Sequence, residues 1–292
     1  MASLKDIKIK ISGVGKTKQI TKAMNMVASA KLRGAQSRMD RFRAYADRFQ
    51  VLLADIAARS QEEHLHPLLL PRKEIVTTGI VLVTSDRGLC GSFNNNLIAA
   101  ALKAAARKNA EGKRIVFFCV GRKGRDAVAK KGYAVQRYIP GQTGVIAYPS
   151  ADRLGVELIN AFQTSKLDEV IIIHGEFVSL MRQTPVTHIL LPLNISDVKT
   201  PAPIAMTEYI YEPAGPALMA ELLPRVIKAL IYRGLLDTST SEHAARMVAM
   251  DNATRNCNDL TKTLTKLFNK TRQAAITKDL MDIVGGAEAL NG

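Results

Sequence analysis

Two segments, one near each end of the chain, carry apolar residues at alternating steps of three and four. The C-terminal segment has seven apolar residues in eight such positions: Met250, Ala253, Cys257, Leu260, Leu264, Leu267, Thr271 and Ala274. Most positions between them are polar or charged, so the apolar stripe is narrow. A narrow stripe with this spacing is typical of a helix that pairs with one other helix along a single seam.

The N-terminal segment keeps the same spacing from Ile7 to Ile56. Its seam positions are Ile7, Ile11, Val14, Lys18, Thr21, Asn25, Ala28, Leu32, Ala35, Met39, Phe42, Ala46, Phe49, Leu53 and Ile56. Two such segments in one chain most simply pair with each other, which predicts a long antiparallel coiled coil of the N- and C-terminal helices. The three consecutive polar positions, Lys18, Thr21 and Asn25, predict a place where the seam faces something other than its partner helix.

Prolines divide the chain into three parts. All eleven lie between Pro67 and Pro224, and one proline inside a helix costs about 3 kcal/mol. The proline-free ends therefore predict two long helices on either side of a globular middle. We expect an N-terminal coiled-coil helix over residues 1–66, an α/β domain over 67–204, and a connecting segment with the C-terminal helix over 205–292.

One place in the last helix can interrupt it. Gly234 and the run Thr238–Ser241 weaken the helical pattern, and Ser239 with Glu242 matches a capping box that would start a new helix. We favour one continuous helix and keep two consecutive helices as the alternative.

The middle of the chain alternates apolar strands with helices. The expected strands are Ile80–Thr84, Ile115–Val120, Tyr133–Ile139, Val170–Ile173 and His188–Leu193, and the expected helices are Asn95–Lys108, Gly124–Lys131 and Asp152–Ser165. Apolar strands separated by helices indicate a mainly parallel sheet that is covered on both faces. The predicted fold class is α/β, with a Rossmann-like domain attached to a long antiparallel coiled coil.

The positive charge is concentrated near the N-terminus. The chain has a formal net charge of +15, and residues 1–60 carry thirteen Lys and Arg against four Asp and Glu. A basic helix binds an acidic partner, which leaves nucleic acid, an anionic membrane or an acidic protein surface as candidates.

The cysteines and the hydropathy pattern suit a soluble cytoplasmic chain. Cys90, Cys119 and Cys257 are odd in number and have no CxxC spacing, which indicates a reducing compartment. The sequence shows neither an apolar signal region nor an apolar run of about 18 residues. We expect no direct insertion into a membrane, although the chain can still dock on a membrane complex.

Two glycine-containing loops resemble ligand-binding motifs only in part. Gly13–Thr17 reads Gly-Val-Gly-Lys-Thr, but Lys10 stands where a phosphate-binding loop needs its first glycine. Asp86–Gly91 lies between an expected strand and an expected helix, where doubly wound sheets bind ligands. Its glycines do not make a G-x-G-x-x-G pattern, so a structural turn is the favoured interpretation and an enzyme site is the alternative.

No residues are predicted to be catalytic, to bind a cofactor or to bind a metal. The five histidines have no zinc spacing, and no Ser-His-Asp or paired-acid arrangement is evident. The sequence therefore favours a binding or structural role over chemistry of its own.

Three parts of the sequence are more specific. They are Ile20–Ala28 (Ile-Thr-Lys-Ala-Met-Asn-Met-Val-Ala), Thr84–Gly91 (Thr-Ser-Asp-Arg-Gly-Leu-Cys-Gly), and Glu242–Met250 together with Asn269–Thr277. In this order they resemble the gamma subunit of bacterial F-type ATP synthase over essentially the whole chain. The resemblance implies a non-catalytic central-stalk rotor whose paired helices lie inside the ring of alpha and beta subunits. It also implies an α/β domain that rests with the epsilon subunit on the c-ring, at the cytoplasmic face of the inner membrane.

The resemblance also implies roles for individual positions. Those matching the rotor–stator contact are Lys18, Lys22, Met24, Arg246, Gln273, Thr277 and Asp279, and Asp279 stands where the family more often has glutamate. Most of them would meet acidic loops of beta, and Thr277 with the C-terminal end would lie in a hydrophobic sleeve. Tyr211 and Glu212 match the foot that contacts the c-ring and epsilon. The cysteine-bearing insertion of the chloroplast form is absent, so no thiol control is expected.

A second function class remains open on the residues alone. The basic first helix is also compatible with a coiled-coil protein that binds nucleic acid through an arm on an α/β domain. No tryptophan and no aromatic stacking motif supports that alternative. A steep dependence of affinity on salt would distinguish it.

Overall fold

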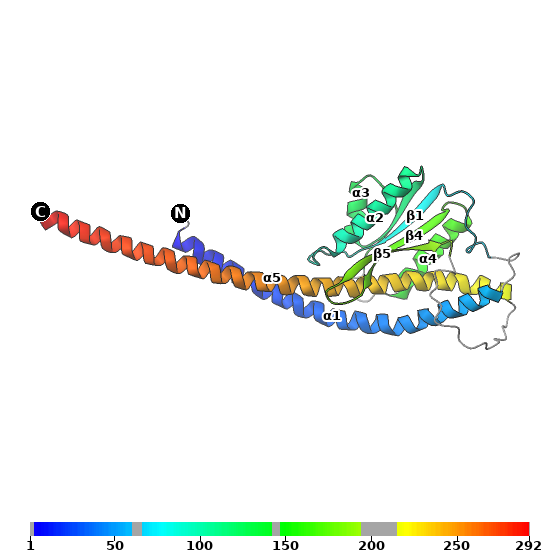
Figure 1. Ribbon diagram of the computed structural model, residues 1–292, viewed down its shortest axis with the longest axis horizontal. Coiled ribbons are helices and arrows are strands. Elements are labelled where there is room, and N and C mark those ends of the chain that lie inside the picture. Colours follow the sequence, from blue (N-terminus) through cyan, green and yellow to red (C-terminus); the bar gives the residue numbers. More distant parts are fainter. Residues whose placement is uncertain (1–2, 60–65, 142–146, 194–214, 292) are drawn as a thin grey trace. The chain divides into compact units, whose positions relative to one another are not determined.

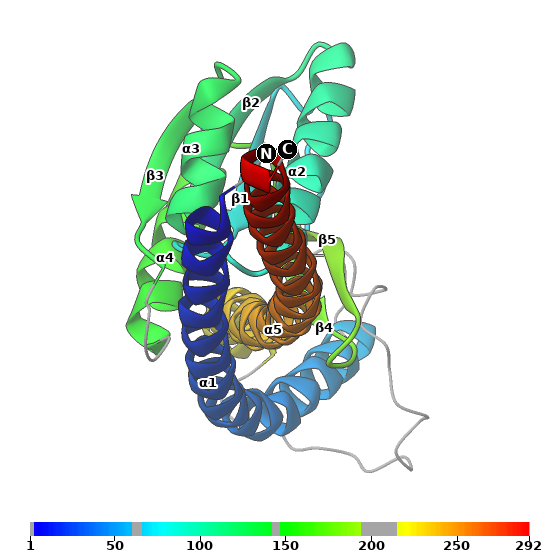
Figure 2. The ribbon, with the colours of Figure 1, turned by 90° about the vertical axis from the view of Figure 1, so that its left-hand side faces the viewer.

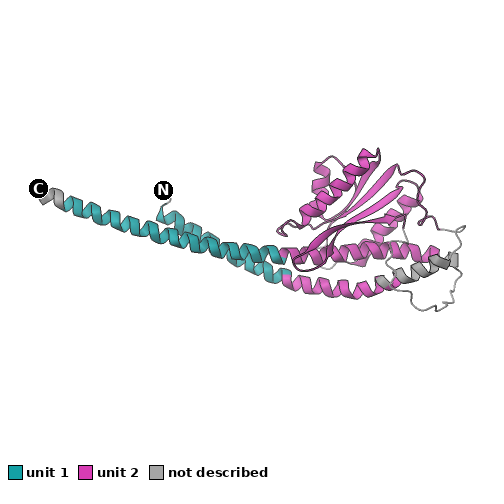
Figure 3. Cartoon of the chain, viewed as in Figure 1, with its two compact units in different colours: residues 1–28, 247–292 teal, residues 29–246 magenta. Residues whose placement is uncertain are grey.

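The computed structural model describes residues 3–59, 66–141, 147–193 and 215–291. The chain forms two compact units, residues 1–28 with 247–292 (unit 1) and residues 29–246 (unit 2), as Figure 3 shows. Two long helices, α1 (Leu4–Arg59) and α5 (Gly215–Asn291), each contribute to both units. The predicted boundaries near residues 66 and 204 stay predictions, because residues 60–65 and 194–214 lie outside the described part.

Unit 1 consists of the first part of α1 and the last part of α5, which lie side by side (Figures 1 and 2). The hydroxyls of Thr21 and Thr254 are 2.8 Å apart, and the Asn25 side-chain amide donates to the Met247 carbonyl at 2.8 Å. The earlier residue of α1 meets the later residue of α5, so the two helices are antiparallel. This confirms the pairing that the heptad spacing predicts.

The same two hydrogen bonds correct one prediction. Thr21 and Asn25 do not turn the seam toward something else, because both bind α5, and Thr21 is buried. Short polar side chains reach a hydroxyl or carbonyl on the facing helix, so they are satisfied inside the seam. A polar pair of this kind specifies the register of two helices.

The α5 seam in unit 1 is shifted by one residue at alternate positions. Leu260 and Leu267, both expected to pair, are 49% and 46% exposed. Thr261 and Phe268 are half-buried in their place. Leu260 with Leu267 and Thr261 with Phe268 each keep the seven-residue spacing of a seam. The spacing alone therefore does not identify which of the two pairs contacts α1.

Unit 2 contains a five-stranded sheet in the order β3-β2-β1-β4-β5. All neighbouring strands are parallel except β4 and β5, which confirms the mainly parallel sheet. The strands are β1 (Thr77–Val83), β2 (Arg114–Val120), β3 (Ala134–Ile139), β4 (Glu169–Phe177) and β5 (Gln183–Leu191), and the helices between them are α2 (Phe93–Ala110), α3 (Arg122–Lys130) and α4 (Tyr148–Gln163). β5 begins earlier than predicted, because its exposed edge residues conceal the apolar pattern.

Helices cover both faces of this sheet (Figure 1). On one face, α4 and the first part of α5 pack against side chains such as Val81, Phe118 and Ile172. On the other face, α2 and α3 pack against Ile80, Phe117 and Ile173. Successive strand residues point to opposite faces, so a strand that is apolar throughout has both faces buried.

α5 is one continuous helix, as favoured, but it begins earlier than the proline map predicts. It starts at Gly215 and holds Pro224 within it. The flanking residues Leu223, Val226 and Ile227 are 0–3% exposed in the core. Burying several aliphatic side chains contributes about 1.5–3 kcal/mol each, which exceeds the cost of one proline.

The run Thr238–Ser241 does not interrupt α5, and two of its hydroxyls form hydrogen bonds with β4. β4 pairs with β1 only as far as Ile173. Beyond that point the Gly175 N–H donates to the Thr238 hydroxyl at 3.1 Å, and the Ser241 hydroxyl donates to the Gly175 carbonyl at 3.2 Å. α5 thus satisfies both backbone polar groups of Gly175, beyond the point where β4 pairs with β1.

Replacing Ser241 with alanine is expected to destabilise unit 2 by about 1–3 kcal/mol, since the buried Gly175 carbonyl loses this donor. Thr240→Val is the matched control, because Thr240 donates only to Leu236 within its own helix, and its loss should stay below about 1 kcal/mol.

All seven tyrosines lie within residues 29–246 and the chain has no tryptophan. Urea unfolding followed by tyrosine fluorescence therefore reports this unit, and equal losses for both variants would contradict the assignment.

Candidate functional site

The predicted contact residues fall in both units. Six of them lie in unit 1: Lys18, Lys22, Met24, Gln273, Thr277 and Asp279. Arg246 is the last residue of unit 2. Tyr211 and Glu212 lie outside the described residues.

The α1 part of unit 1 presents both cations and apolar side chains. Lys18, at a seam position, and Met24, beside the seam, are half-buried, and Lys22 is exposed. Ile20, Met26 and Val27 are 56–60% exposed, on positions that the seam does not use. The resemblance implied Lys22 and Met24 at this surface, but it did not imply Ile20, Met26 or Val27. Because these three apolar residues are not seam positions, the heptad spacing could have predicted that they are exposed.

The C-terminal part of α5 is solvent-exposed on all sides. Gln273, Thr277 and Asp279 are exposed, and so is every described side chain from Ile276 to Ala287. Several of these exposed side chains are large and apolar: Ile276, Leu280, Met281, Ile283 and Val284. Ile276, Leu280 and Ile283 recur at steps of four and three, which places them on one face of the helix. Contiguous exposed apolar residues of this kind mark an interaction site.

Unit 1 is strongly basic. Residues 3–28 and 247–287 hold twelve Lys and Arg against five Asp. Two of these acids are engaged within α5, where Arg255 binds Asp251 at 2.8 Å and Lys262 lies 3.5 Å from Asp259. The surplus of positive charge favours an acidic partner and raises the rate at which one associates.

Arg246 lies in a more enclosed place than the other candidates. Its side chain is 12% exposed, and its guanidinium binds Glu242 at 2.8 Å and donates to the Gly88 carbonyl at 3.2 Å. Burial raises the pKa of Glu242, and the neighbouring Arg246 partly offsets that rise. Arg246 thus fastens the loop after β1 to α5.

The loop Asp86–Gly91 satisfies its polar groups within the protein, as a structural turn does. The Asp86 carboxylate accepts from the backbone N–H groups of Arg122 and Gly141 at 2.8 and 3.0 Å. The Asn94 amide donates to the Ser85 hydroxyl at 2.8 Å, and burial raises the pKa of the nearby Cys90 thiol. These contacts lie at the carboxyl ends of the strands, where many doubly wound sheets bind ligands.

Within residues 3–59, 66–141, 147–193 and 215–291, no group of three His, Cys, Asp or Glu side chains is placed to hold a metal ion. None of the helices in those ranges is both long and apolar enough to cross a membrane.

A family model described as ATP synthase matches residues 3–290. A chain from Nitratidesulfovibrio vulgaris (strain Miyazaki F), called ATP synthase gamma chain, is 60% identical over 294 residues and is covered completely, as this chain is. The chain belongs to the ATP synthase gamma family. The resemblance drawn from the three sequence segments is therefore confirmed.

Solved structures share the fold of this gamma-family chain. A chain of the Euglena gracilis mitochondrial ATP synthase, in a structure of OSCP, F1 and c-ring, matches with a TM-score of 0.68 and 20% identity. The match covers 98% of this chain and 94% of that one. A chain from the central stalk and c-ring of the Tetrahymena thermophila enzyme matches with a TM-score of 0.57 and 24% identity, over 80% and 99%. Both of these chains thus share the fold of this chain.

Proposed function

We propose that the chain is the central-stalk rotor shaft of an F-type ATP synthase. It couples ion-driven rotation of the c-ring to ATP synthesis and hydrolysis at the beta subunits, and is itself non-catalytic. The observation that carries this proposal is 60% identity, over the full length of both chains, to an ATP synthase gamma chain. The antiparallel helix pair of unit 1 and its basic, partly apolar surface support a shaft that turns inside a ring.

The physical demands on a shaft agree with this surface. A paired helix resists twisting better than a single one, and the hydrogen bonds of Thr21 and Asn25 hold its register. Each close pair between a cation of the shaft and a carboxylate of the ring contributes about 1–4 kcal/mol at effective dielectric constants of 80 to 20. Contacts of that strength favour one state of a facing subunit and still release it, which is coupling by differential contact.

The proposed partners are the alpha and beta subunits, the epsilon subunit and the c-ring. The structural neighbours come from assemblies of F1 with the c-ring and of the central stalk with the c-ring. The proposed ring contacts are Lys18, Lys22, Met24, Arg246, Gln273, Thr277 and Asp279, and the proposed foot is Tyr211 and Glu212. A guanidinium has five N–H donors, and the bonds to Glu242 and Gly88 do not occupy all of them. Arg246 would bind the ring through the remaining donors. The proposed location is peripheral, at the cytoplasmic face of a bacterial inner membrane, with no nucleic-acid partner.

Purification of the tagged chain from its native membranes tests the function. We expect alpha and beta to co-purify with it in a complex that hydrolyses ATP. Recovery of the chain without them, together with a steep salt-dependent affinity for tRNA or duplex DNA, would favour the nucleic-acid-binding alternative.

Met24→Lys is expected to lower the coupling of the assembled enzyme. The added cation would lie near carboxylates of the ring and hold one rotor position too tightly, so fewer protons are pumped per ATP hydrolysed. Proton pumping and ATP hydrolysis in inverted membrane vesicles give this ratio. Met24→Leu is the control, because it replaces the same side chain with one of similar size and adds no charge. A ratio unchanged in Met24→Lys, or lowered equally in both variants, would contradict this placement of Met24.

A further inference from the structure

The connection between β4 and β5, residues 178–182, carries three exposed apolar side chains. We call these five residues the hairpin tip. Val178 is 52% exposed, Leu180 45% and Met181 79%. Exposed apolar side chains gathered in one place mark an interaction site, whereas scattered single ones do not.

Hydrogen bonds within the hairpin fix the conformation of the tip. The backbone N–H groups of Val178 and Ser179 donate to the Arg182 carbonyl at 3.3 and 3.0 Å. The Gln183 side-chain amide donates to the carbonyls of Ser179 and Leu180 at 3.0 and 2.8 Å. A surface that is ordered before it binds loses less conformational entropy on binding.

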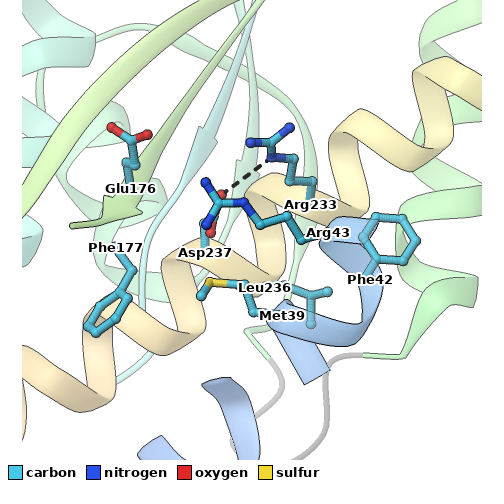
Figure 4. A pocket seen from close by; sticks show the side chains of 8 residues that line it. All are labelled: Met39, Phe42, Arg43, Glu176, Phe177, Arg233, Leu236 and Asp237. Carbon is cyan, nitrogen blue, oxygen red and sulfur yellow. Dashed lines mark ion pairs between the residues drawn. The ribbon is translucent and has the colours of Figure 1, made fainter. Parts of the chain in front are cut away.

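The base of the hairpin is attached to both long helices within unit 2. Gly175 forms hydrogen bonds with α5 through its N–H and its carbonyl. The last two residues of β4, Glu176 and Phe177, line a small pocket with Met39 of α1 and Asp237 of α5 (Figure 4). The Asp237 side chain is 13% exposed, which places it well inside this junction. The hairpin tip therefore has a defined position relative to α1 and α5 in unit 2.

The hairpin extends past the carboxyl end of β1. β4 pairs with β1 as far as Ile173 and continues to Phe177, which at about 3.3 Å per residue carries the chain about 13 Å further. The loop after β1 lies at the same end of the sheet, where Arg246 holds the Gly88 carbonyl. Ser241, which holds Gly175, precedes Arg246 by about 7.5 Å along α5. The hairpin and the loop are thus attached to neighbouring turns of α5.

The small size of the hairpin tip restricts the kind of partner that can use it. A stable interface buries about 800 Å² on each partner, or about 20–30 residues a side. Five residues cannot hold a second copy of the chain or any other partner alone. They can add to the binding of a partner that other parts of the chain already hold, because the second contact is then intramolecular.

Two such partners are proposed above, the ring of alpha and beta subunits and the c-ring with epsilon. The proposed foot, Tyr211 and Glu212, comes shortly before the start of α5 at Gly215. The hairpin is attached to α5 from Thr238 onward, about 35 Å along the helix from that start. Arg246, a proposed ring contact, lies only about two turns beyond Thr238. The position of the hairpin along α5 therefore favours the ring.

We propose that the hairpin tip is a further contact with the ring of alpha and beta subunits. Leu180 and Met181 would touch an apolar surface of a ring subunit, and the exposed Arg182 would pair with a carboxylate beside it. Apolar contact is non-directional, so the same tip can meet one copy of the ring subunit after another as the shaft turns. The proposal rests on the rotor function and adds a part of unit 2 through which it acts.

Photo-cross-linking in the assembled enzyme tests the proposal. The variant Met181→p-benzoylphenylalanine is purified with the alpha and beta subunits and irradiated. We expect a covalent product with alpha or beta, and ATP hydrolysis should fall in proportion to the cross-linked fraction, because a shaft tied to the ring cannot turn. Val156→p-benzoylphenylalanine is the matched control, since Val156 is an apolar residue of α4 that is 41% exposed, and it should give no product with alpha or beta.

The outcomes distinguish the proposal from the rotor function on which it rests. No product from Met181 in an enzyme that still contains alpha and beta would overturn the proposal alone. So would a product with epsilon or the c-ring that leaves ATP hydrolysis unchanged. Failure of the wild-type chain to co-purify with alpha and beta would contradict the rotor function itself. Leu180→p-benzoylphenylalanine gives the same test if the Met181 variant assembles poorly.

Discussion

Replacing Gly121 with alanine is expected to destabilise unit 2 by about 4 kcal/mol or more. Gly121 joins β2 to α3 with φ at +92°, a conformation that side-chain-bearing residues rarely adopt. A Cβ at this position would lie 2.1 Å from the Thr84 carbonyl oxygen and 2.8 Å from its hydroxyl. Strain and overlap therefore act together.

The residue that meets this Cβ cannot easily move away. Thr84 donates from its backbone N–H to the Val120 carbonyl at 2.8 Å, and its hydroxyl accepts from the Gly124 N–H at 2.8 Å. Gly121 itself donates to the Ile139 carbonyl at 3.0 Å. A shift large enough to relieve the overlap would break these bonds, which connect β1, β2 and β3 at their carboxyl ends.

Gly112→Ala separates strain from overlap. Gly112 has φ at +77°, but a Cβ there would meet no atom within 4 Å. Its loss should be about 1–2 kcal/mol, the cost of a left-handed backbone alone. Urea unfolding followed by tyrosine fluorescence gives both values, and similar losses at the two sites would show that Thr84 yields to the new methyl group.

Replacing Lys108 with methionine is expected to destabilise the same unit by about 3–5 kcal/mol, because Glu169 would remain buried without its counter-charge. The Lys108 ammonium lies 2.5 Å from the Glu169 carboxylate, and the two side chains are 11% and 7% exposed. Thr78 also donates to this carboxylate, at 3.2 Å. The pair connects the last turn of α2 to the first residue of β4.

The double variant Lys108→Met with Glu169→Gln identifies the cause of that loss. Without the buried charge, most of the stability should return, and a double-mutant cycle gives the coupling of the two groups. Urea unfolding measures all three variants. A loss below about 1 kcal/mol in Lys108→Met would show that nearby Lys113, which binds Glu111 at 2.6 Å, turns to Glu169 instead.

The loop after β1 is held by contacts within unit 2. Arg246, Asn94 and the Asp86 carboxylate each bind the protein's own polar groups there. In many doubly wound sheets the same region binds a ligand. Here the contacts hold Leu89, which is 63% exposed with φ at +63°, in a conformation that a non-glycine residue rarely adopts.

The sequence alone determined the type of most elements and the pairing of the two terminal helices. The spacing of Ile7 to Phe49 predicted a helix with one buried stripe, and every described side chain at those seam positions is buried or half-buried. The apolar runs at Ile80–Val83 and Val170–Ile173 predicted central strands, and all of these residues are 0–4% exposed. Such predictions succeed because they depend on periods of 3.6 and 2, which are properties of local backbone geometry.

Only the tertiary structure decided which residues meet. Thr261 rather than Leu260 lies toward the seam, Thr21 finds Thr254, and the hydroxyl of Ser241 reaches Gly175. The enclosure of Arg246 and Asp237 was equally hidden, because each is an ordinary charged residue on an amphipathic helix until a distant segment covers it. Burial and hydrogen bonding of a polar group depend on residues as far as 233 positions away, and no local pattern records them.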